Sequence, residues 1–414
     1  MTAVLSAADF QRLITRALAP GALQPAFQPV VELETGRVAG YEALARWPGQ
    51  VDADPGSVFA AAAQVGQVVE LDWACRQAGL RAALAADLGA DQTLFLNVEA
   101  ATLGQPAPPE YRELVEAARG RFRVVLELTE RELLSDPAEL LRLVGWARDQ
   151  GWGIAMDDVG AEPDSLSLLP FVAPDVVKLD LSLVQQTHGH RQASTMLAVM
   201  DYAEQTGAVV LAEGIETSAH LDQALTLGAT YGQGWMLGRP GPIRPGGTEA
   251  TLPRTKTPPP VVRTPFDLVA DAPTLRTGRK RLLLGMSRQL ERMACAPDEP
   301  AVLLSAFQHG RNLTPATATR YQAMAAGLPF VGALGLELST RPVPGVRGAR
   351  LDPADQLIGE WTVVVIGPHY HGALIARDCG DSGPDLDRRF DFVLTQNREL
   401  VWQAGRSLMS RLTR

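Results

Sequence analysis

Polar side chains recur along the first two-thirds of this 414-residue chain, each directly after a short and largely apolar stretch. The positions are Glu42, Asn97, Glu127, the pair Asp157 and Asp158, Lys178, Glu213 and Gln233. Most are carboxylates, with two amides and one lysine. Carboxylate and amide oxygens are the ligands that Mg²⁺ and similar cations prefer. The series therefore predicts divalent metal binding and phosphoryl chemistry.

The adjacent aspartates suggest more than one metal ion. Because neighbouring residues on a strand point to different sides, Asp157 and Asp158 suit two metals that lie close together. Paired metals activate a water molecule and stabilise charge on a reacting phosphodiester. Lys178, facing carboxylates, suits neutralisation of developing phosphate charge or orientation of the attacking water.

The elements that must position these residues alternate between strand and helix. Apolar strand candidates lie at residues 37–41, 93–96, 124–126, 153–156, 176–177, 209–212 and 229–232. Helical patterns lie at 57–81, 137–150, 193–205 and 217–227, and residues 1–19 suit a capping helix. Short buried strands separated by helices predict a parallel sheet. A repeat of about 30 residues predicts a TIM-like (β/α) barrel with its active site at the C-terminal strand ends.

A region dense in proline and glycine marks the domain boundary. It lacks hydrophobic periodicity and contains the polyproline run Pro258 to Pro260. We therefore predict a barrel domain at 1–240, a linker at 241–264 and a second, smaller α+β domain at 265–414. In the second domain we expect a helix at 282–293, strands at 301–307, 330–336, 361–366 and 373–376, and a closing helix from Phe392 or Leu400 to Leu412.

Composition excludes several classes of protein. The net charge of −9 argues against binding of nucleic-acid polymers, although it permits a small anion held by local cations. No apolar run reaches the ~18 residues that cross a bilayer, and the N-terminal stretch lacks the apolar core of a signal peptide. The three cysteines are widely spaced, so we expect no disulfide framework and a cytoplasmic protein.

The ordered polar motifs resemble those of EAL domains. The first is Glu42-Ala43-Leu44, within the run from Tyr41 to Trp47. The others, in chain order, are Asn97, Glu127 to Glu130, Asp157-Asp158, Lys178 to Asp180, Glu213 to Thr217 and Gln233-Gly234. Active members of that family are cyclic di-GMP phosphodiesterases. The resemblance implies metal-dependent hydrolysis of cyclic di-GMP to linear pGpG, and a homodimer formed through the barrel.

The same resemblance assigns roles to individual residues. It implies two divalent ions, Mg²⁺ or Mn²⁺, bound by Glu42, Asn97, Glu127, Asp157, Asp158 and Glu213. Glu213 would act as general base, with Lys178 at the nucleophilic water and Asp158 beside it. Leu44, Arg46 and Gln233 would contact the substrate. Glu130, Glu216 and Asp180 would support the site.

One segment departs from the family pattern. After the double aspartate, EAL enzymes usually continue Phe-Gly-Thr-Gly, whereas this chain reads Val159-Gly160-Ala161-Glu162 and runs on to Ser165. The glutamate matching Glu130 usually anchors this loop through a hydroxyl group, and Ala161 stands at that position. An alternative therefore stays open: a catalytically inactive EAL-like module acting as a cyclic di-GMP receptor or protein-interaction regulator.

The C-terminal domain resembles the DICT sensory domain. The similarity lies in residues 307–311, 358–361, 376–378 and 390–395. It implies a sensory domain whose ligand or partner is unknown, and which regulates the barrel. Trp361 has two interpretations here, as the lining of a ligand pocket or as a core residue at the start of a strand.

Overall fold

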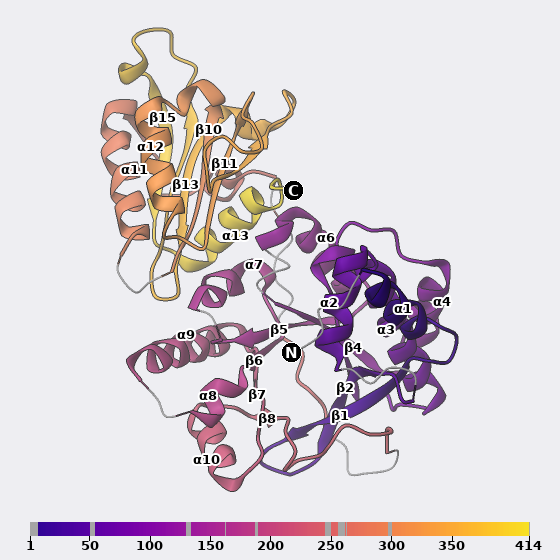
Figure 1. Cartoon of the computed structure of the whole chain (residues 1–414). Coiled ribbons are helices and arrows are strands. Elements are labelled where there is room, and N and C mark those ends of the chain that lie inside the picture. Colours follow the sequence, from indigo (N-terminus) through magenta and orange to yellow (C-terminus); the bar gives the residue numbers. More distant parts are fainter. Residues whose placement is uncertain are drawn as a thin grey trace, which may run out of the picture. The chain divides into compact units, whose positions relative to one another are not determined.

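The computed structural model describes residues 7–49, 54–129, 134–161, 163–186, 189–244, 250–255, 261, 263–296 and 300–413. The chain forms two compact units. Unit 1 comprises residues 1–132, 143–161 and 174–256, and unit 2 comprises residues 133–142, 162–173 and 257–414. Pro258 to Pro260, Glu130 and Glu162 lie outside the described residues. Figure 1 labels most of the helices and strands of both units.

Unit 1 contains a closed eight-stranded barrel, as the sequence predicts. Its strands are β1 (Gln24–Glu32), β2 (Val38–Arg46), β3 (Thr93–Asn97), β4 (Arg123–Leu128), β5 (Gly153–Val159), β6 (Val176–Leu179), β7 (Val209–Ala212) and β8 (Tyr231–Gly232). Strands β2 to β8 pair in parallel, but β1 runs antiparallel to both β2 and β8. The seven predicted strands correspond to β2 to β8, so the parallel sheet is confirmed for them; the antiparallel β1 was not predicted.

Helices follow most strands of the barrel sequence. They are α1 (Ala7–Ala17), α2 (Pro55–Val65), α3 (Val68–Ala85), α4 (Pro109–Ala118), α6 (Pro137–Asp149), α7 (Leu169–Val172), α8 (Leu181–Gln185), α9 (His190–Thr206) and α10 (Ser218–Thr226). The single helix predicted at 57–81 is two helices. Gly66 ends α2 with a φ of 71°, a left-handed conformation that glycine adopts without steric cost. Thr217 caps α10, since its side chain accepts a hydrogen bond from the His220 amide.

Residues 250–255 close the end of the barrel at which the strands begin. Ala250 and Leu252 are buried in the same apolar cluster as Val30 and Phe95. The guanidinium of Arg123, the first residue of β4, donates to the Pro253 carbonyl at 2.9 Å. This closure leaves the carboxyl ends of the strands as the end available for a site.

Unit 2 contains a seven-stranded mixed sheet in the order β12-β11-β10-β13-β14-β15-β9. The strands are β9 (Arg276–Arg279), β10 (Val302–His309), β11 (Phe330–Leu336), β12 (Arg347–Arg350), β13 (Glu360–Ile366), β14 (His371–Asp378) and β15 (Arg389–Thr395). Its main helices are α11 (Lys280–Ala294), α12 (Pro315–Ala325) and α13 (Arg398–Met409). Leu290 of α11 and Tyr321 of α12 pack into one core cluster with Leu303 and Val363 of the sheet.

The expectations for unit 2 are partly confirmed. The helix at 282–293 and the four predicted strands are present, but β9, β12 and β15 were not expected. A helix starting at Phe392 is wrong, because Phe392 lies in β15 and pairs with Ala376. Helix α13 begins only after Asn397, whose side chain accepts from the Leu400 amide.

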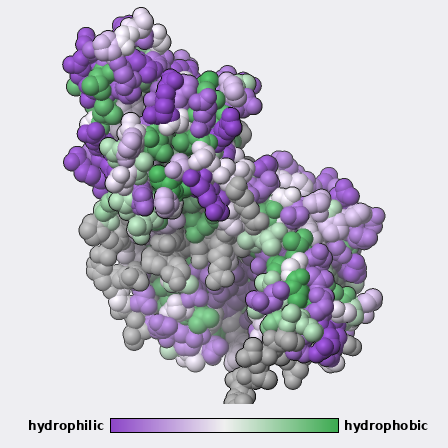
Figure 2. All heavy atoms as spheres, turned by 45° about the horizontal axis from the view of Figure 1, so that its top comes forward, coloured by the Kyte–Doolittle hydropathy of each residue, from purple (hydrophilic) through white to green (hydrophobic). Residues whose placement is uncertain are grey.

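The described surface mixes polar and apolar residues. On the face drawn in Figure 2, hydrophobic residues form small groups among hydrophilic ones. Among the described residues, no helix has the length and apolar character needed to cross a membrane.

Candidate active site

Lys178 lies at the centre of the polar cluster at the carboxyl ends of the barrel strands. Its side chain is 1% exposed. The ammonium nitrogen Nζ lies 2.6 Å from Glu127 Oε1, 2.7 Å from Glu213 Oε1 and 2.9 Å from Asp157 Oδ1. Glu42 Oε2 is further away, at 3.7 Å. Polar residues of β2, β4, β5 and β6, and the residue that follows β7, therefore come together at one point.

Two amides hold the Glu42 carboxylate from opposite sides. Asn97 Nδ2 donates to Oε1 at 3.1 Å, and Gln233 Nε2 donates to Oε2 at 3.0 Å. Asn97 ends β3, the parallel neighbour of β2, and Gln233 directly follows β8. Closure of the barrel thus joins residues that are 191 positions apart in the chain.

The Asp157–Asp158 pair lies in an irregular part of β5. The register between β5 and β6 shifts between Met156 and Val159. Asp158 has a φ of 53°, in the left-handed region that aspartate tolerates better than most residues. Oxygens of Asp157, Asp158 and Glu213 lie within 4.8 Å of one another. This register shift, rather than simple strand alternation, explains how two consecutive carboxylates can reach the same side-chain cluster.

Gly160 is required by close packing behind this pair. It has a φ of 98°, and a Cβ atom there would lie 2.4 Å from Leu183 Cδ1. Only glycine fits such a position without a shift of the neighbouring side chain. Ala161 follows with an exposed side chain, and its amide donates to the Asp158 carbonyl at 3.1 Å.

The acidic groups have strongly altered proton affinities. Burial and the neighbouring Glu42 charge raise the pKa of Glu127 well above its usual range. Burial, helped by Asp157 and Glu42, raises the pKa of Glu213 to about 8 despite the opposing charge of Lys178. Burial opposes ionisation of Glu42 too, but Lys178 and the Gln233 and Asn97 hydrogen bonds outweigh it and lower its pKa. For Lys178, the carboxylates overcome burial and raise its pKa.

The donor set fits divalent metal ions. Five carboxylates meet one ammonium group, so the ionised site has an excess of four negative charges. Glu127 Oε2 and Gln233 Oε1 are buried and have no hydrogen-bond partner in the residues that the structure describes, whereas Glu127 Oε1 and Asp157 Oδ1 pair with the Lys178 ammonium group. Buried oxygens normally have a partner. Oxygen atoms of this kind, in this number, are what Mg²⁺ or Mn²⁺ coordinates.

Other predicted residues lie outside this cluster. The Asp180 side chain caps α8 by accepting from the Ser182 amide at 2.9 Å. Glu216 has an exposed side chain, and Glu130 is not described. Arg46, at the end of β2, donates to the Ala45 carbonyl at 2.8 Å, and Leu44 is half-buried two residues before it. Within the described residues no ion pair joins Arg46 to the cluster.

The sequence prediction missed Gln28, which lies in β1. Gln28 is the direct partner of Glu42 in the antiparallel β1–β2 pair, so both side chains lie on the same face of the barrel wall. The amide also donates to the Gly238 carbonyl at 3.4 Å. Pro25 and Pro29 flank it and weaken the sequence signal for a strand, which explains the omission.

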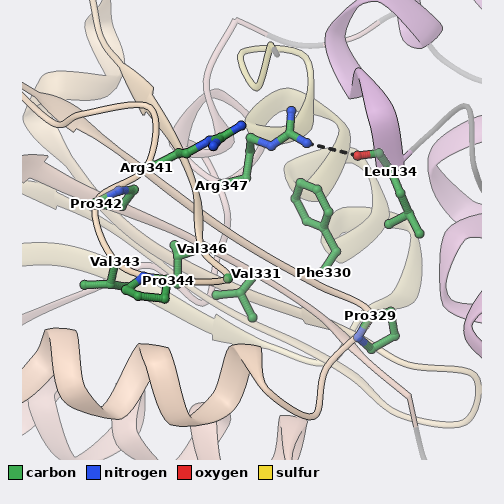
Figure 3. Close-up of a pocket in the computed structure, with 11 residues that line it drawn as sticks. Leu134, Pro329, Phe330, Val331, Arg341, Pro342, Val343, Pro344, Val346 and Arg347 are labelled. Atoms are coloured by element: carbon green, nitrogen blue, oxygen red, sulfur yellow. Dashed lines mark hydrogen bonds between the residues drawn. The ribbon is translucent and has the colours of Figure 1, made fainter. Parts of the chain in front are cut away.

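Unit 2 has a separate hollow of about 680 Å³, drawn in Figure 3. Prolines and valines of the segment 342–346 line it together with Phe330 and Val331. Arg347 donates to the Leu134 carbonyl at 3.1 Å and to the Ser135 carbonyl at 3.2 Å. These contacts tie segment 133–142 into unit 2, and the described residues that line the hollow include no carboxylate or nucleophile.

Comparison with known protein families finds one match in the N-terminal part of the chain and another in the C-terminal part. The EAL domain family matches residues 11–240. The family described as a sensory domain in diguanylate cyclases and two-component systems, DICT, matches residues 268–378.

The curated relatives include proteins named as cyclic di-GMP phosphodiesterases or probable ones. Cyclic di-GMP phosphodiesterase RocR of Pseudomonas aeruginosa is 32% identical over 236 residues, which cover 55% of this chain and 60% of RocR. The probable cyclic di-GMP phosphodiesterase PdeG of Escherichia coli is 28% identical, with 56% of this chain and 47% of PdeG covered. The chain therefore spans only part of the length of these relatives.

A solved structure of similar fold is a c-di-GMP complex of the phosphodiesterase PaMucR. It has a TM-score of 0.50 and 25% identity, and the match covers 56% of this chain and 98% of that chain. The manganese and c-di-GMP complex of Klebsiella pneumoniae BlrP1 has 29% identity, a TM-score of 0.48, and covers 54% of this chain and 57% of that one. From the family match and the barrel that carries it, the chain belongs to the EAL domain family, and a DICT sensory domain follows its EAL domain.

Proposed function

We propose that this protein hydrolyses cyclic di-GMP to linear pGpG with the help of two divalent cations, Mg²⁺ or Mn²⁺. The observation that carries the proposal is the convergence of Glu42, Glu127, Asp157 and Glu213 on Lys178, with Glu127 Oε2 buried and without a hydrogen-bond partner in the described residues. In a member of the EAL family, this donor set favours the activity named for RocR.

The metal-binding residues in this proposal are the six oxygen donors at the strand ends. They are Glu42, Asn97, Glu127, Asp157, Asp158 and Glu213. Bound divalent ions supply Lewis-acid chemistry, activating water and stabilising charge on phosphate oxygens. Two such ions would balance the excess of four negative charges that the ionised cluster carries.

The chain's own residues position the substrate and move the proton. Glu213, whose carboxylate lies 2.7 Å from the Lys178 ammonium group, would act as the general base, the role that the resemblance to EAL domains implies. Lys178 keeps its proton because four carboxylates surround it, so it provides a fixed positive charge beside the reacting groups. Arg46, with Leu44 and Gln233, would hold the dinucleotide, since a guanidinium group pairs well with phosphate.

We propose further that the DICT domain regulates the barrel. The segment that connects β5 to β6 supports this, because residues 162–173 belong to unit 2. Arg406 of α13 donates from Nε to the Pro170 carbonyl at 2.7 Å, and the Phe171 ring packs beside Gly405. The segment that follows Asp157 and Asp158 is therefore in contact with α13 of the C-terminal domain.

A catalytically inactive receptor for cyclic di-GMP is the second candidate. One observation favours it: Ala161 stands where the family has a hydroxyl residue, in the stretch directly after Asp157 and Asp158. Such a protein would bind the dinucleotide without opening it.

Turnover of cyclic di-GMP separates the two candidates. Purified full-length protein with Mn²⁺ or Mg²⁺ should produce pGpG. Glu42→Ala should reduce the rate by about 100-fold or more, because it removes a carboxylate of the metal-binding cluster. Glu34→Ala, which removes an exposed carboxylate from the β1–β2 turn, is the matched control and should leave turnover unchanged. Tight binding with no pGpG under either metal would establish the receptor instead.

The loop after the aspartates gives a second prediction. Replacing Ala161 by Thr and Glu162 by Gly restores the family pattern and should raise the turnover number if this loop limits activity. Progress curves at saturating cyclic di-GMP measure the effect. An unchanged or lower rate would show that the loop is not the limiting element.

A further inference from the structure

A second hollow in unit 2, of about 270 Å³, has the features of a small-molecule site. It lies between helix α11, the end of β10, the start of α12 and the first residues of β13. Its volume is just below the range typical of sites for drug-sized ligands. A compact ligand would therefore fill it.

One face of α11 forms a wall of this hollow. Lys280, Leu284, Ser287, Arg288 and Glu291 all line it, and each lies three or four residues from another of the five. Residues at such spacings share one side of a helix. The wall therefore presents polar and charged groups together with one leucine.

Two aromatic side chains supply an apolar floor. Phe307 of β10 and Trp361 of β13 are direct partners in the antiparallel ladder, so they lie side by side on the same face of the sheet. Both line the hollow and are buried, with exposures of 9% and 8%. Leu386, which is exposed, adds an apolar group to the lining. A flat, apolar ring would pack well on this floor.

The backbone is unusual at the polar edge of the floor. Gln308 is buried and has a φ of 62°, a conformation that residues other than glycine rarely adopt. The register between β10 and β11 shifts between Ala306 and His309, which accommodates it. Such irregularities often redirect a side chain toward a ligand. Gln308 lines the hollow together with Asn312, so two amides border the aromatic floor.

Three cationic side chains are among the described residues that line the hollow, and one of them has no charge partner there. Lys280 pairs with Asp385 at 2.7 Å, and Arg320 pairs with the buried Glu291 at 2.5 Å. Arg288 is exposed, and no hydrogen bond or ion pair joins it to another group in the part of the chain that the structure describes. An anionic group of a ligand would find its charge partner at Arg288.

We propose that this hollow binds a small planar aromatic anion. The ring packs on Phe307 and Trp361, and the anionic group pairs with Arg288. The amides of Gln308 and Asn312 meet polar substituents on the ring. This assigns a ligand class to the C-terminal domain and does not depend on catalysis by the barrel.

Calorimetric titration of the full-length protein tests the proposal, with indole-3-acetate as the anionic probe and indole-3-acetamide as its neutral analogue. The acid should bind at least about tenfold more tightly than the amide, because it alone forms a charge-assisted contact. Arg288→Gln should remove this preference. Arg292→Gln is the matched control, because Arg292 is exposed on the same helix and does not line the hollow.

A second variant tests whether the probes bind in this hollow or elsewhere on the protein. Thr317→Trp places a large side chain in the hollow from the first turns of α12, and it should abolish binding of both probes. Equal affinity for acid and amide, or equal effects of the two arginine substitutions, would overturn the proposal. Lack of saturation by indole-3-acetate and benzoate up to about 10 mM would also overturn it.

Discussion

At the scale of single residues, Lys178 decides the charge balance of the barrel site. It is the buried cation to which Glu127, Asp157 and Glu213 all approach within 2.9 Å. Removing one partner from a buried ionic cluster is costly, because the remaining charges lose their compensation. In this protein, removal of the Lys178 charge would leave several buried carboxylates without compensation at once.

Lys178→Met should therefore lower the stability of the metal-free protein, by about 3 kcal/mol. Added Mn²⁺ should raise the melting temperature of this variant more than that of the wild type, because the cation replaces the missing charge. Thermal unfolding in EDTA and in Mn²⁺ measures both effects. Lys178→Arg, which keeps the charge, is the control. Equal melting temperatures for wild type and Lys178→Met in EDTA would contradict this role.

The residue types at the strand ends could be predicted from the sequence, but their contacts could not. Each of Glu42, Asn97, Glu127, Lys178 and Gln233 follows an apolar run, and this pattern depends only on local sequence. That Asn97 and Gln233 both hold Glu42 follows from closure of the barrel, which brings distant strands together. Asp180 follows a strand too, yet it caps α8, because an aspartate at that position also suits a helix start.

At the scale of elements, irregular strands carry most of what the sequence did not reveal. The register shift in β5 and the left-handed Asp158 set the direction of two carboxylates. No local sequence pattern predicts such a register shift, because the shift results from the pairing of β5 with β6. The antiparallel β1 was missed for another reason, since its two prolines suppress the strand signal around Gln28.

The contact between Arg411, which follows α13, and Asp355, in the turn before β13, predicts a pH effect on stability. Asp355 accepts from Arg411 Nε at 2.7 Å and from the Leu357 amide at 2.9 Å. Burial alone would raise the pKa of Asp355, but the Arg411 hydrogen bond and charge and the Leu357 amide lower it. A lowered pKa stabilises the fold above the unfolded value of about 3.9, and this contribution disappears as the pH falls through the folded value.

The stability difference between wild type and Asp355→Asn should accordingly be present at pH 6 and disappear as the pH falls below about 4. Urea unfolding at several pH values measures it. Asp352→Asn removes a nearby carboxylate that pairs with no arginine in the described residues and serves as the control. A difference that grows on acidification would contradict the assignment.

At the scale of the whole molecule, the spatial units do not follow the family boundaries. The EAL match runs without interruption over residues 11–240, yet segments 133–142 and 162–173 belong to unit 2. A boundary read from composition is linear and cannot show this exchange. It depends on long-range contacts such as that between Arg406 and the Pro170 carbonyl.

Disrupting that contact should change the activity of the barrel. Arg406→Ala removes the hydrogen bond that holds the segment between β5 and β6, so the carboxylates of β5 lose part of their support. We expect turnover of cyclic di-GMP to fall by about 2- to 30-fold, the range of typical coupling energies. Glu399→Ala, at an exposed position of the same helix, is the control. Unchanged turnover in Arg406→Ala would remove the support for regulation through this segment.

Chromatographic detection of pGpG, after cyclic di-GMP is incubated with the 414-residue protein and Mn²⁺, tests the proposed phosphodiesterase activity most directly. The wild type should form pGpG, and no product should appear when EDTA replaces Mn²⁺ or when Glu42→Ala is assayed with Mn²⁺ present. Saturable binding of cyclic di-GMP by the wild type with no pGpG in either Mn²⁺ or Mg²⁺ would contradict it.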